Sequence, residues 1–194
     1  MSECQSVDGW ARRRARIAGE IEHTAIELLA EYGEGVTVEQ IAAASGISMR
    51  TFFRYYPSRD DLLVALPRRL NALTCQRVLD RPADETVLDS FIAAVRMGID
   101  EEDEHLVRLW GQAIGRGFRP AAAPDGPMVT EYAGVIAARL GVAPDDVRAQ
   151  VQATAIAAVM WSTFVRWLEQ GAVEPLAKFL ERAFDVLADL DRHP

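Results

Sequence analysis

Apolar side chains near the start of the chain recur at three- and four-residue steps. Ile17, Ile21, Ala25, Leu28 and Tyr32 follow this spacing, so they fall on one face of an amphipathic helix. A Gly-Glu-Gly sequence follows directly, and glycine is common where helices end. The pattern predicts a first long helix that ends at this glycine-rich step.

Two short helices and the start of a longer one are predicted from capping patterns. Thr37 is followed three residues later by Gln40, which is the spacing of a capping box, so a helix should begin at about residue 38. Gly46 suits a left-handed turn after that helix. Ser48 is placed to cap the next helix, and Ser58 to cap a third helix after a proline.

Longer helical patterns fill the remainder of the chain, and no β-strand pattern competes with them. The Gly- and Pro-rich stretch Gly115–Pro127 is predicted to be a loop. The expected fold class is therefore all-α. The longer predicted helices are Ser58–Asp80, Thr86–Ile99, Glu102–Ile114, Met128–Leu140, Pro144–Gln170 and Glu174–Leu190.

The helix predicted at Pro144–Gln170 has two apolar faces, whereas a helix at the surface of a monomer needs only one. One face, together with part of Leu176–Leu190, is therefore expected to pack against a second copy as the four-helix interface of a homodimer. The first stripe comprises Val147, Val151, Ala155, Ala158, Val165 and Leu168, and the second comprises Ile156, Met160, Phe164 and Trp167.

Composition narrows the class of protein. The chain has 194 residues, is 49% hydrophobic and carries a net charge of −8, which suits a folded acidic protein. Its longest apolar run, Ala155–Trp161, is far shorter than the ~20 residues that span a bilayer, and the N-terminus has no apolar signal-peptide core. Cys4 and Cys75 do not make a disulfide framework, and the scattered histidines predict no metal site. We expect a cytoplasmic protein with no membrane association and no cofactor.

The segment Thr37–Leu63 has the plan of a helix-turn-helix, with two short helices joined by a turn that contains glycine. Residues 48–59 hold three arginines and no acid, a local charge of +3 in an acidic chain. Ser48, Met49 and Arg50 occupy the N-terminal end of the second helix, where DNA-reading helices contact base edges. A basic face confined to this segment indicates binding to double-stranded DNA.

The sequence IAAASGISMRTFFRYYPSRDDLL resembles the TetR family of regulators, whose pattern runs roughly I-A-x-x-A-G-V-S-x-x-T-x-Y-x-Y-F-x-S-K-E-x-L. The likeness covers about residues 12–63. It implies an all-α homodimer with an N-terminal helix-turn-helix domain and a C-terminal effector-binding and dimerisation domain. We predict the first domain at residues 1–60, with 1–10 as a flexible tail, and the second at residues 61–194. The identical positions are Ile41, Ala42, Gly46, Ser48, Thr51, Tyr55, Ser58 and Leu62.

The resemblance also implies two sets of DNA contacts. The phosphate set is Thr37, Thr51, Tyr55 and Arg59, and the base-edge set is Ser48, Met49, Arg50 and Phe53. Phe53 stands where tyrosine is common, so a hydroxyl contact is lost, but its ring suits a thymine methyl group. Arg54 stands where an aromatic is common and adds a candidate phosphate or base contact. Phe52 and Tyr56 are expected to face the core.

The arginine-rich run Arg12–Arg16 precedes the first helix in this interpretation. One alternative is an arm that enters the minor groove, as homeodomain arms do. The other is a solvated helix start. The sequence leaves both open.

Large apolar residues in the second half are candidates for an effector site that takes an apolar or aromatic small molecule. The alternative is that they are ordinary core residues. The candidates are Trp110, Met128, Met160, Trp161, Phe164 and Trp167.

We therefore predict a transcriptional repressor that a small hydrophobic effector releases from its operator. One alternative is a helical ligand-binding or scaffold protein without DNA binding. An enzyme is less favoured, because the sequence offers no local Ser/His/Asp or Cys/His grouping and no phosphate loop.

Overall fold

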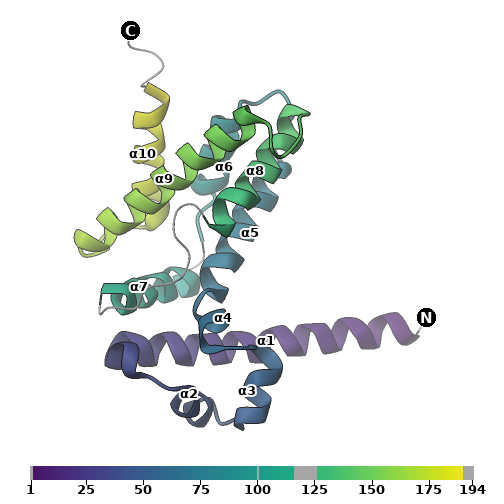
Figure 1. Ribbon diagram of the computed structural model, residues 1–194, viewed down its shortest axis with the longest axis vertical. Coiled ribbons are helices and arrows are strands. Elements are labelled where there is room, and N and C mark those ends of the chain that lie inside the picture. The colour runs from purple at the N-terminus through teal and green to yellow at the C-terminus, as the bar shows by residue number, and fades with distance from the viewer. Residues whose placement is uncertain (1, 100, 116–125, 190–194) are drawn as a thin grey trace. The chain divides into compact units, whose positions relative to one another are not determined.

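The protein is all-α in the computed structural model, as predicted (Figure 1). Within the described residues, no helix is both long and apolar enough to cross a membrane. Contacts divide the chain into two compact units. The structure describes residues 2–99, 101–115 and 126–189, of which 2–66 and 109–115 form the first unit and the others the second.

The first unit combines one long helix with short helices that side-chain caps delimit. The capping box is confirmed: Thr37 Oγ1 accepts from the Gln40 amide at 3.3 Å, and Gln40 Oε1 accepts from the Thr37 amide at 2.8 Å. Gly46 has a φ of 68°, the left-handed turn expected there. The elements are α1 (Ser2–Tyr32), η1 (Gly33–Gly35), α2 (Val38–Ala44), α3 (Met49–Tyr55) and α4 (Arg59–Leu63).

The core of this unit lies between α1 and the short helices. Ile21, Ile41 and Phe52 are fully buried there. The Tyr56 ring is also buried, and its hydroxyl donates to the Ala18 carbonyl oxygen at 3.0 Å, which ties the end of α3 to α1. The prediction that Phe52 and Tyr56 face the core is confirmed.

The start of α1 differs from expectation. We expected a flexible tail at residues 1–10, whereas α1 begins at Ser2. The sequence up to residue 16 contains no proline, which is the strongest helix breaker, and residues 11–16 are all alanine or arginine, which are good helix formers. The Arg14 guanidinium also lies 5.6 Å from the Trp10 ring centre, one helical turn away.

The single helix predicted at Ser58–Asp80 is wrong, because the chain breaks at Val64 between α4 and α5 (Ala65–Leu79). Pro67 explains the break. Proline has no N–H and cannot donate to the Leu63 carbonyl four residues earlier. Trp110, in α7 (Glu101–Gly115), supplies the missing donor: its indole N–H lies 3.0 Å from that oxygen.

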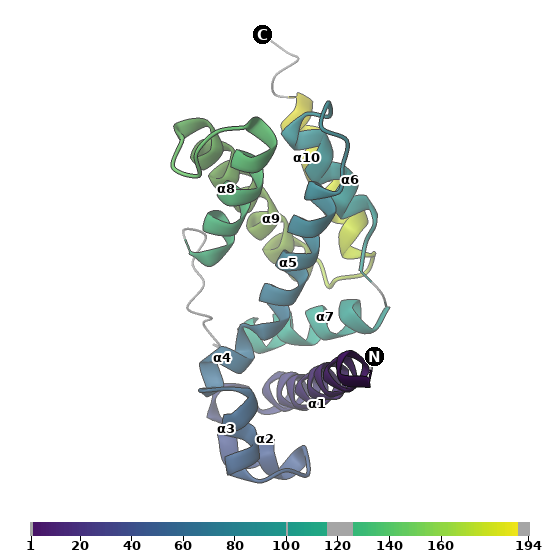
Figure 2. The same ribbon diagram turned by 90° about the vertical axis from the view of Figure 1, so that its right-hand side faces the viewer.

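The second unit is a helical bundle (Figure 2). Helix α8 packs along α9, and α10 packs on both α6 and α9. The core between them is apolar, with Phe91 and Tyr132 in an edge-to-face contact and Phe184 fully buried. Besides α5 and the first part of α7, the unit contains α6 (Val87–Arg96), α8 (Pro127–Leu140), α9 (Val147–Glu169) and α10 (Leu176–Asp189).

Helix α9 begins three residues later than predicted. Pro144 does not open it; Asp146 is the N-cap and accepts from the Arg148 amide at 2.9 Å. A capping carboxylate accepts a hydrogen bond from a free N–H of the first turn, whereas a proline is only tolerated at that position. The carboxylate therefore determines where the helix starts. Residues 116–125 of the predicted loop Gly115–Pro127 lie outside the described residues.

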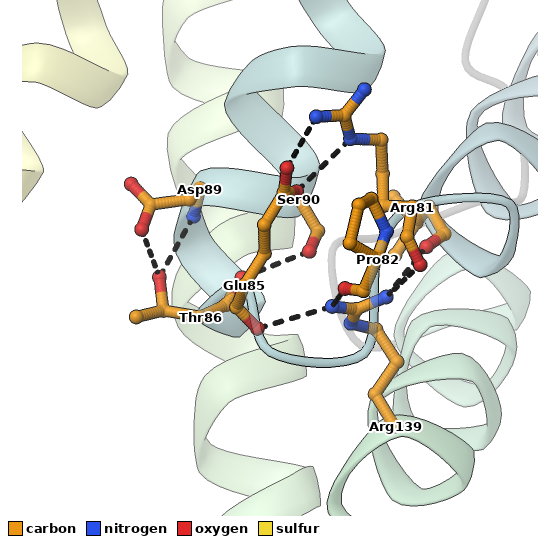
Figure 3. Close-up of polar contacts among 8 residues, drawn as sticks. Arg81, Pro82, Glu85, Thr86, Asp89, Ser90 and Arg139 are labelled. Carbon is orange, nitrogen blue, oxygen red and sulfur yellow. Dashed lines mark hydrogen bonds and ion pairs between the residues drawn. The ribbon is translucent and has the colours of Figure 1, made fainter.

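Arg139 at the end of α8 holds the turn between α5 and α6 (Figure 3). Its guanidinium donates to backbone carbonyl oxygens on both sides of the turn. The Arg81–Glu85 ion pair closes the same turn and lowers the pKa of the Glu85 carboxyl. The four acceptors of Arg139 are the carbonyls of Val78 at 3.1 Å, Arg81 at 3.1 Å, Pro82 at 2.7 Å and Glu85 at 3.1 Å.

The two apolar stripes of α9 have different environments. Ile156 and Trp167 of the second stripe are buried in the unit. Val147 and Val151 of the first stripe are 71% and 61% exposed. One apolar face of α9 therefore remains open to solvent in the single chain.

Candidate nucleic-acid interface

The second helix of the helix-turn-helix, α3, is held by its cap and by the turn before it. Ser48 Oγ accepts from the Thr51 amide at 3.1 Å, as predicted. The Ile47 amide donates to the Ala42 carbonyl at 2.9 Å, which closes the turn behind Gly46. Buried Phe52 anchors the inner side of α3 in the core, so the position of the outer side of α3 is fixed.

The predicted base-edge residues lie on this outer side or at its N-terminal end. Ser48 and Arg50 are exposed, Met49 is half-buried, and Phe53 is 49% exposed. Arg50 has no hydrogen-bond or ion-pair partner among the described residues. An exposed guanidinium without a partner is free to bind a guanine edge with two hydrogen bonds.

The predicted phosphate residues are more strongly engaged by the protein. Thr37 Oγ1 accepts in the cap of α2, so its O–H remains able to donate, and Thr51 Oγ1 shares a hydrogen bond of 3.0 Å with Ser48 Oγ at the cap of α3. Arg59 is half-buried and donates to the Glu34 carbonyl at 2.9 Å, so it also fixes η1. Tyr55 is half-buried at the end of α3. The structure does not test these phosphate contacts, which stay predictions.

The arginine-rich run Arg12–Arg16 lies inside α1, so it is neither an extended arm nor a helix start. Arg14 is directed towards α3: it donates to the Arg54 carbonyl at 3.3 Å and lies 5.5 Å from the centre of the Tyr55 ring. Arg16 pairs within α1 with Glu20. Sequence reasoning missed the contact between Arg14 and Tyr55. The four-residue spacing of Trp10 and Arg14 indicated only the contact between those two residues, and no sequence signal indicated Tyr55.

The predicted effector residues have several environments. Trp110 is buried in the first unit, where its indole N–H donates to the Leu63 carbonyl. Trp167 is buried in the second, where it donates to the Glu174 carbonyl at 2.8 Å and Arg108 lies over its ring. Met128 and Met160 pack against the second unit's core, and the rings of Trp161, Phe164 and Trp167 form a row along α9. Trp110 and Trp167 are therefore core residues, and a role in effector binding stays a prediction for all six.

The second unit also has a cleft of about 730 Å³ between α6 and α10. Charged side chains dominate its lining, with Asp89, Asp185 and Arg96 among them. None of the six predicted effector residues lines this cleft. Its polarity does not match an apolar or aromatic effector.

The fold and the exposed face of α3 define a helix-turn-helix DNA-binding transcriptional regulator. Residues 21–66 match the family of bacterial regulatory proteins named tetR, and residues 128–191 match the MftR C-terminal domain. The chain is 31% identical, over 198 aligned positions, to a protein of Mycobacterium tuberculosis (strain ATCC 25618 / H37Rv) named as a mycofactocin biosynthesis transcriptional regulator, MftR. That alignment covers 93% of this chain and 94% of the relative. The chain therefore belongs to the tetR family of regulators.

A solved structure agrees at the level of the fold. A tetR-family transcriptional regulator from Streptomyces coelicolor superposes with a TM-score of 0.54 at 19% sequence identity. The superposition covers 91% of this chain and 80% of that one.

Proposed function

We propose that this regulator is a homodimeric repressor, which a small apolar or aromatic effector releases from its operator. The observation that carries the proposal is Arg50, exposed at the start of α3 without a partner among the described residues. In a helix-turn-helix this position faces base edges. The protein acts as a binding protein rather than an enzyme, and it acts on chromosomal DNA in the cytoplasm.

The two sets of side chains have different roles in DNA recognition. Ser48, Met49, Arg50 and Phe53 read base edges in the major groove, with Arg54 beside them. Thr37, Thr51, Tyr55 and Arg59 hold phosphates and fix the register of α3. Phosphate contacts position a protein on DNA but carry no sequence information, so specificity comes from the first set.

The open face of α9 supports a homodimer. Val147 and Val151 leave an apolar stripe exposed in the single chain, and Val186 of α10 is exposed as well. Burying such a stripe against a second copy removes apolar surface from water. The dimer places two copies of α3 on an operator with two half-sites.

The effector site belongs to the helical domain at residues 61–194. The row Trp161, Phe164 and Trp167 and the thioethers of Met128 and Met160 offer an apolar, polarizable lining. An effector lowers operator occupancy only if it binds the DNA-incompetent conformation more tightly than the competent one. The similarity to MftR over both units supports mycofactocin biosynthesis genes as the regulated set.

The test is a binding measurement of the full chain on two duplexes, one from upstream of its own coding sequence and one scrambled. We expect binding to the upstream duplex to be tighter by a factor of ~10³ or more. Arg50→Ala should lose most of this preference, whereas Arg68→Ala, at an exposed arginine of α5, should retain it. Equal weak binding of wild type to both duplexes, or none, would favour the helical protein without DNA binding.

A further inference from the structure

Arg14 of α1 is bound to the C-terminal end of the recognition helix. Its Nη2 donates to the Arg54 carbonyl oxygen at 3.3 Å. Arg54 lies in the last turn of α3, where carbonyls lack partners within the helix and the helix dipole favours a cation. Arg14 therefore caps α3 from a helix that lies forty residues earlier in the sequence.

The same guanidinium lies against two aromatic rings. It is 5.6 Å from the Trp10 ring centre and 5.5 Å from the Tyr55 ring centre, and Arg54 lies 5.3 Å from the Tyr55 ring. All three distances are within the ~6 Å over which a cation is attracted to an aromatic ring. The order of contacts is Trp10–Arg14–Tyr55–Arg54. Tyr55 thus has a cation close to its ring from each of two helices.

The Tyr55 hydroxyl makes no hydrogen bond with the part of the chain that the structure describes. The Tyr55 ring is held by the two arginines, whereas its hydroxyl group has no partner among the described residues. That is the arrangement expected of a side chain prepared to donate to a group outside the protein.

We propose that Arg14 is a positioning residue for DNA binding, which holds the Tyr55 ring and the end of α3 so that the Tyr55 hydroxyl meets a phosphate. The inference rests on the proposed function of Tyr55. It assigns Arg14 a role within the protein, in place of direct contact with DNA. A side chain held before binding loses less conformational freedom on binding, which is worth roughly 0.5–1.5 kcal/mol per side chain, or a ~2- to 10-fold change in affinity per half-site.

The chemistry of this contact requires arginine. A planar guanidinium donates from its edge while its faces lie against rings, so it serves Arg54, Trp10 and Tyr55 together. A lysine ammonium carries the same charge but has no plane to place between the rings. Arg14→Lys therefore distinguishes a positioning role of Arg14 from a role of its positive charge. A residue that acts on DNA only through its charge tolerates replacement by lysine.

The experiment measures the affinity of the full chain for one operator duplex across a salt series. Arg14→Lys should lower affinity by ~2- to 10-fold per half-site and Tyr55→Phe by at least as much, without changing the salt slope, because no charge is lost. The double variant should be no weaker than Tyr55→Phe, since positioning the hydroxyl has no effect once the hydroxyl is removed. Arg16→Lys makes the same change two residues away, at a side chain paired with Glu20, and should leave affinity unchanged.

Thermal unfolding of each variant shows whether it is folded at the temperature of the binding measurement. If Arg14→Lys binds as tightly as wild type, or if the double variant loses the product of the two single factors, Arg14 is not a positioning residue. If wild type does not prefer the upstream duplex over the scrambled one, the proposed function is wrong, and this inference is wrong with it. Wild-type binding with an unaffected Arg14→Lys overturns the inference alone.

Discussion

The indole N–H of Trp110 donates to the backbone carbonyl of Leu63 at 3.0 Å, in a buried position. This hydrogen bond takes the place of one that the backbone cannot make, because Pro67 has no N–H to offer that carbonyl. The break between α4 and α5 is thus satisfied by a side chain from α7.

The first prediction follows from this replacement. Trp110→Phe leaves the Leu63 carbonyl buried without a donor, which costs ~1–3 kcal/mol in the free energy of unfolding. Pro67→Ala restores an N–H at the fourth residue after Leu63, so Trp110→Phe should cost less in that background. Urea unfolding at one fixed protein concentration measures all four combinations. Equal costs of Trp110→Phe in both backgrounds would contradict the role assigned to Pro67.

The second prediction separates two arginines by role. Arg50→Ala should lower operator affinity by ~1–3 kcal/mol per half-site and relax preference at one base pair, because a bidentate guanine contact is lost. Arg59→Ala should weaken operator and scrambled DNA alike and lower the salt slope by about one per contact, or about two for a dimer. Affinities on both duplexes across a salt series decide this. Equal losses for Arg50→Ala on both duplexes would remove it from the base-reading set.

Arg59 needs one further control, because it also donates to the Glu34 carbonyl at 2.9 Å. Replacement of Arg59 removes its hydrogen bond to η1 as well as any phosphate contact. A local loss of structure lowers affinity without changing the number of counterions released. The salt slope, rather than affinity alone, therefore carries this assignment.

The third prediction concerns assembly. Val151→Glu places a charge on the exposed apolar stripe of α9, and in a dimer that charge would be buried without a partner in each copy. An uncompensated buried charge costs ~3–5 kcal/mol, so the variant should be monomeric at concentrations where wild type is a dimer. Light scattering gives the mass. Met97→Glu changes an exposed apolar residue at the end of α6 and should leave the dimer intact. A monomeric wild type at micromolar concentration would refute the dimer.

The fourth prediction tests the hydrogen bonds of Arg139 to the turn between α5 and α6. Lysine keeps the charge but cannot serve four carbonyls placed around a fork, so Arg139→Lys should destabilise the protein. Hydrogen bonds to charged groups are worth ~1.5–3 kcal/mol, and at least one of them is lost. Arg68→Lys, at an exposed position, should change stability little. Hydrogen exchange should report faster opening at residues 78–86 in Arg139→Lys and unchanged rates in Arg68→Lys.

The fifth prediction is a pH dependence at the start of α9. Hydrogen bonds from Arg148 hold the pKa of Asp146 at about 2, below its ordinary value of 3.8. A carboxyl with a lowered pKa in the folded state stabilises that state above the ordinary value, and this contribution is lost as pH falls towards about 2. Asn still caps a helix but has no charge. Wild type should therefore unfold at higher urea than Asp146→Asn at neutral pH, and the difference should close between about pH 4 and pH 2.

Asp145 provides the matched control for that experiment. It is exposed and has no partner among the described residues, although it is next to Asp146 in the sequence. Asp145→Asn should follow wild type at every pH. A difference between wild type and Asp146→Asn that persists unchanged at low pH would show that the ion pair with Arg148 is not its source.

Local rules explain which parts of the fold were predictable. The capping box at Thr37, the cap at Ser48 and the turn at Gly46 depend on residues within five positions of one another, so the sequence displays them directly. The break at Val64 was missed although its cause, Pro67, lies only three residues further on and is a local signal. Only the replacement donor is distant, since Trp110 lies forty-seven residues beyond Leu63. The early start of α1 was missed because a charged helix has no apolar stripe to reveal it.

The same distinction applies to the DNA-binding surface. Arg50 and Tyr55 were identified because the helix-turn-helix motif places them. The role of Arg14 required knowledge of where α1 lies against α3, since the two residues in contact, Arg14 and Arg54, are forty positions apart. Sequence pattern identified the residues expected to contact DNA but not the residue that holds one of them in place.

Arg139 has an evolutionary consequence, because all of its acceptors are backbone carbonyls. Every amino acid carries a backbone carbonyl, so substitutions in the turn at residues 80–85 leave these acceptors in place wherever the backbone path is kept. The donor has no such redundancy, since no other side chain offers five N–H groups in a rigid fork. As far as the contacts with Arg139 are concerned, mutational tolerance should therefore be higher along the turn than at position 139.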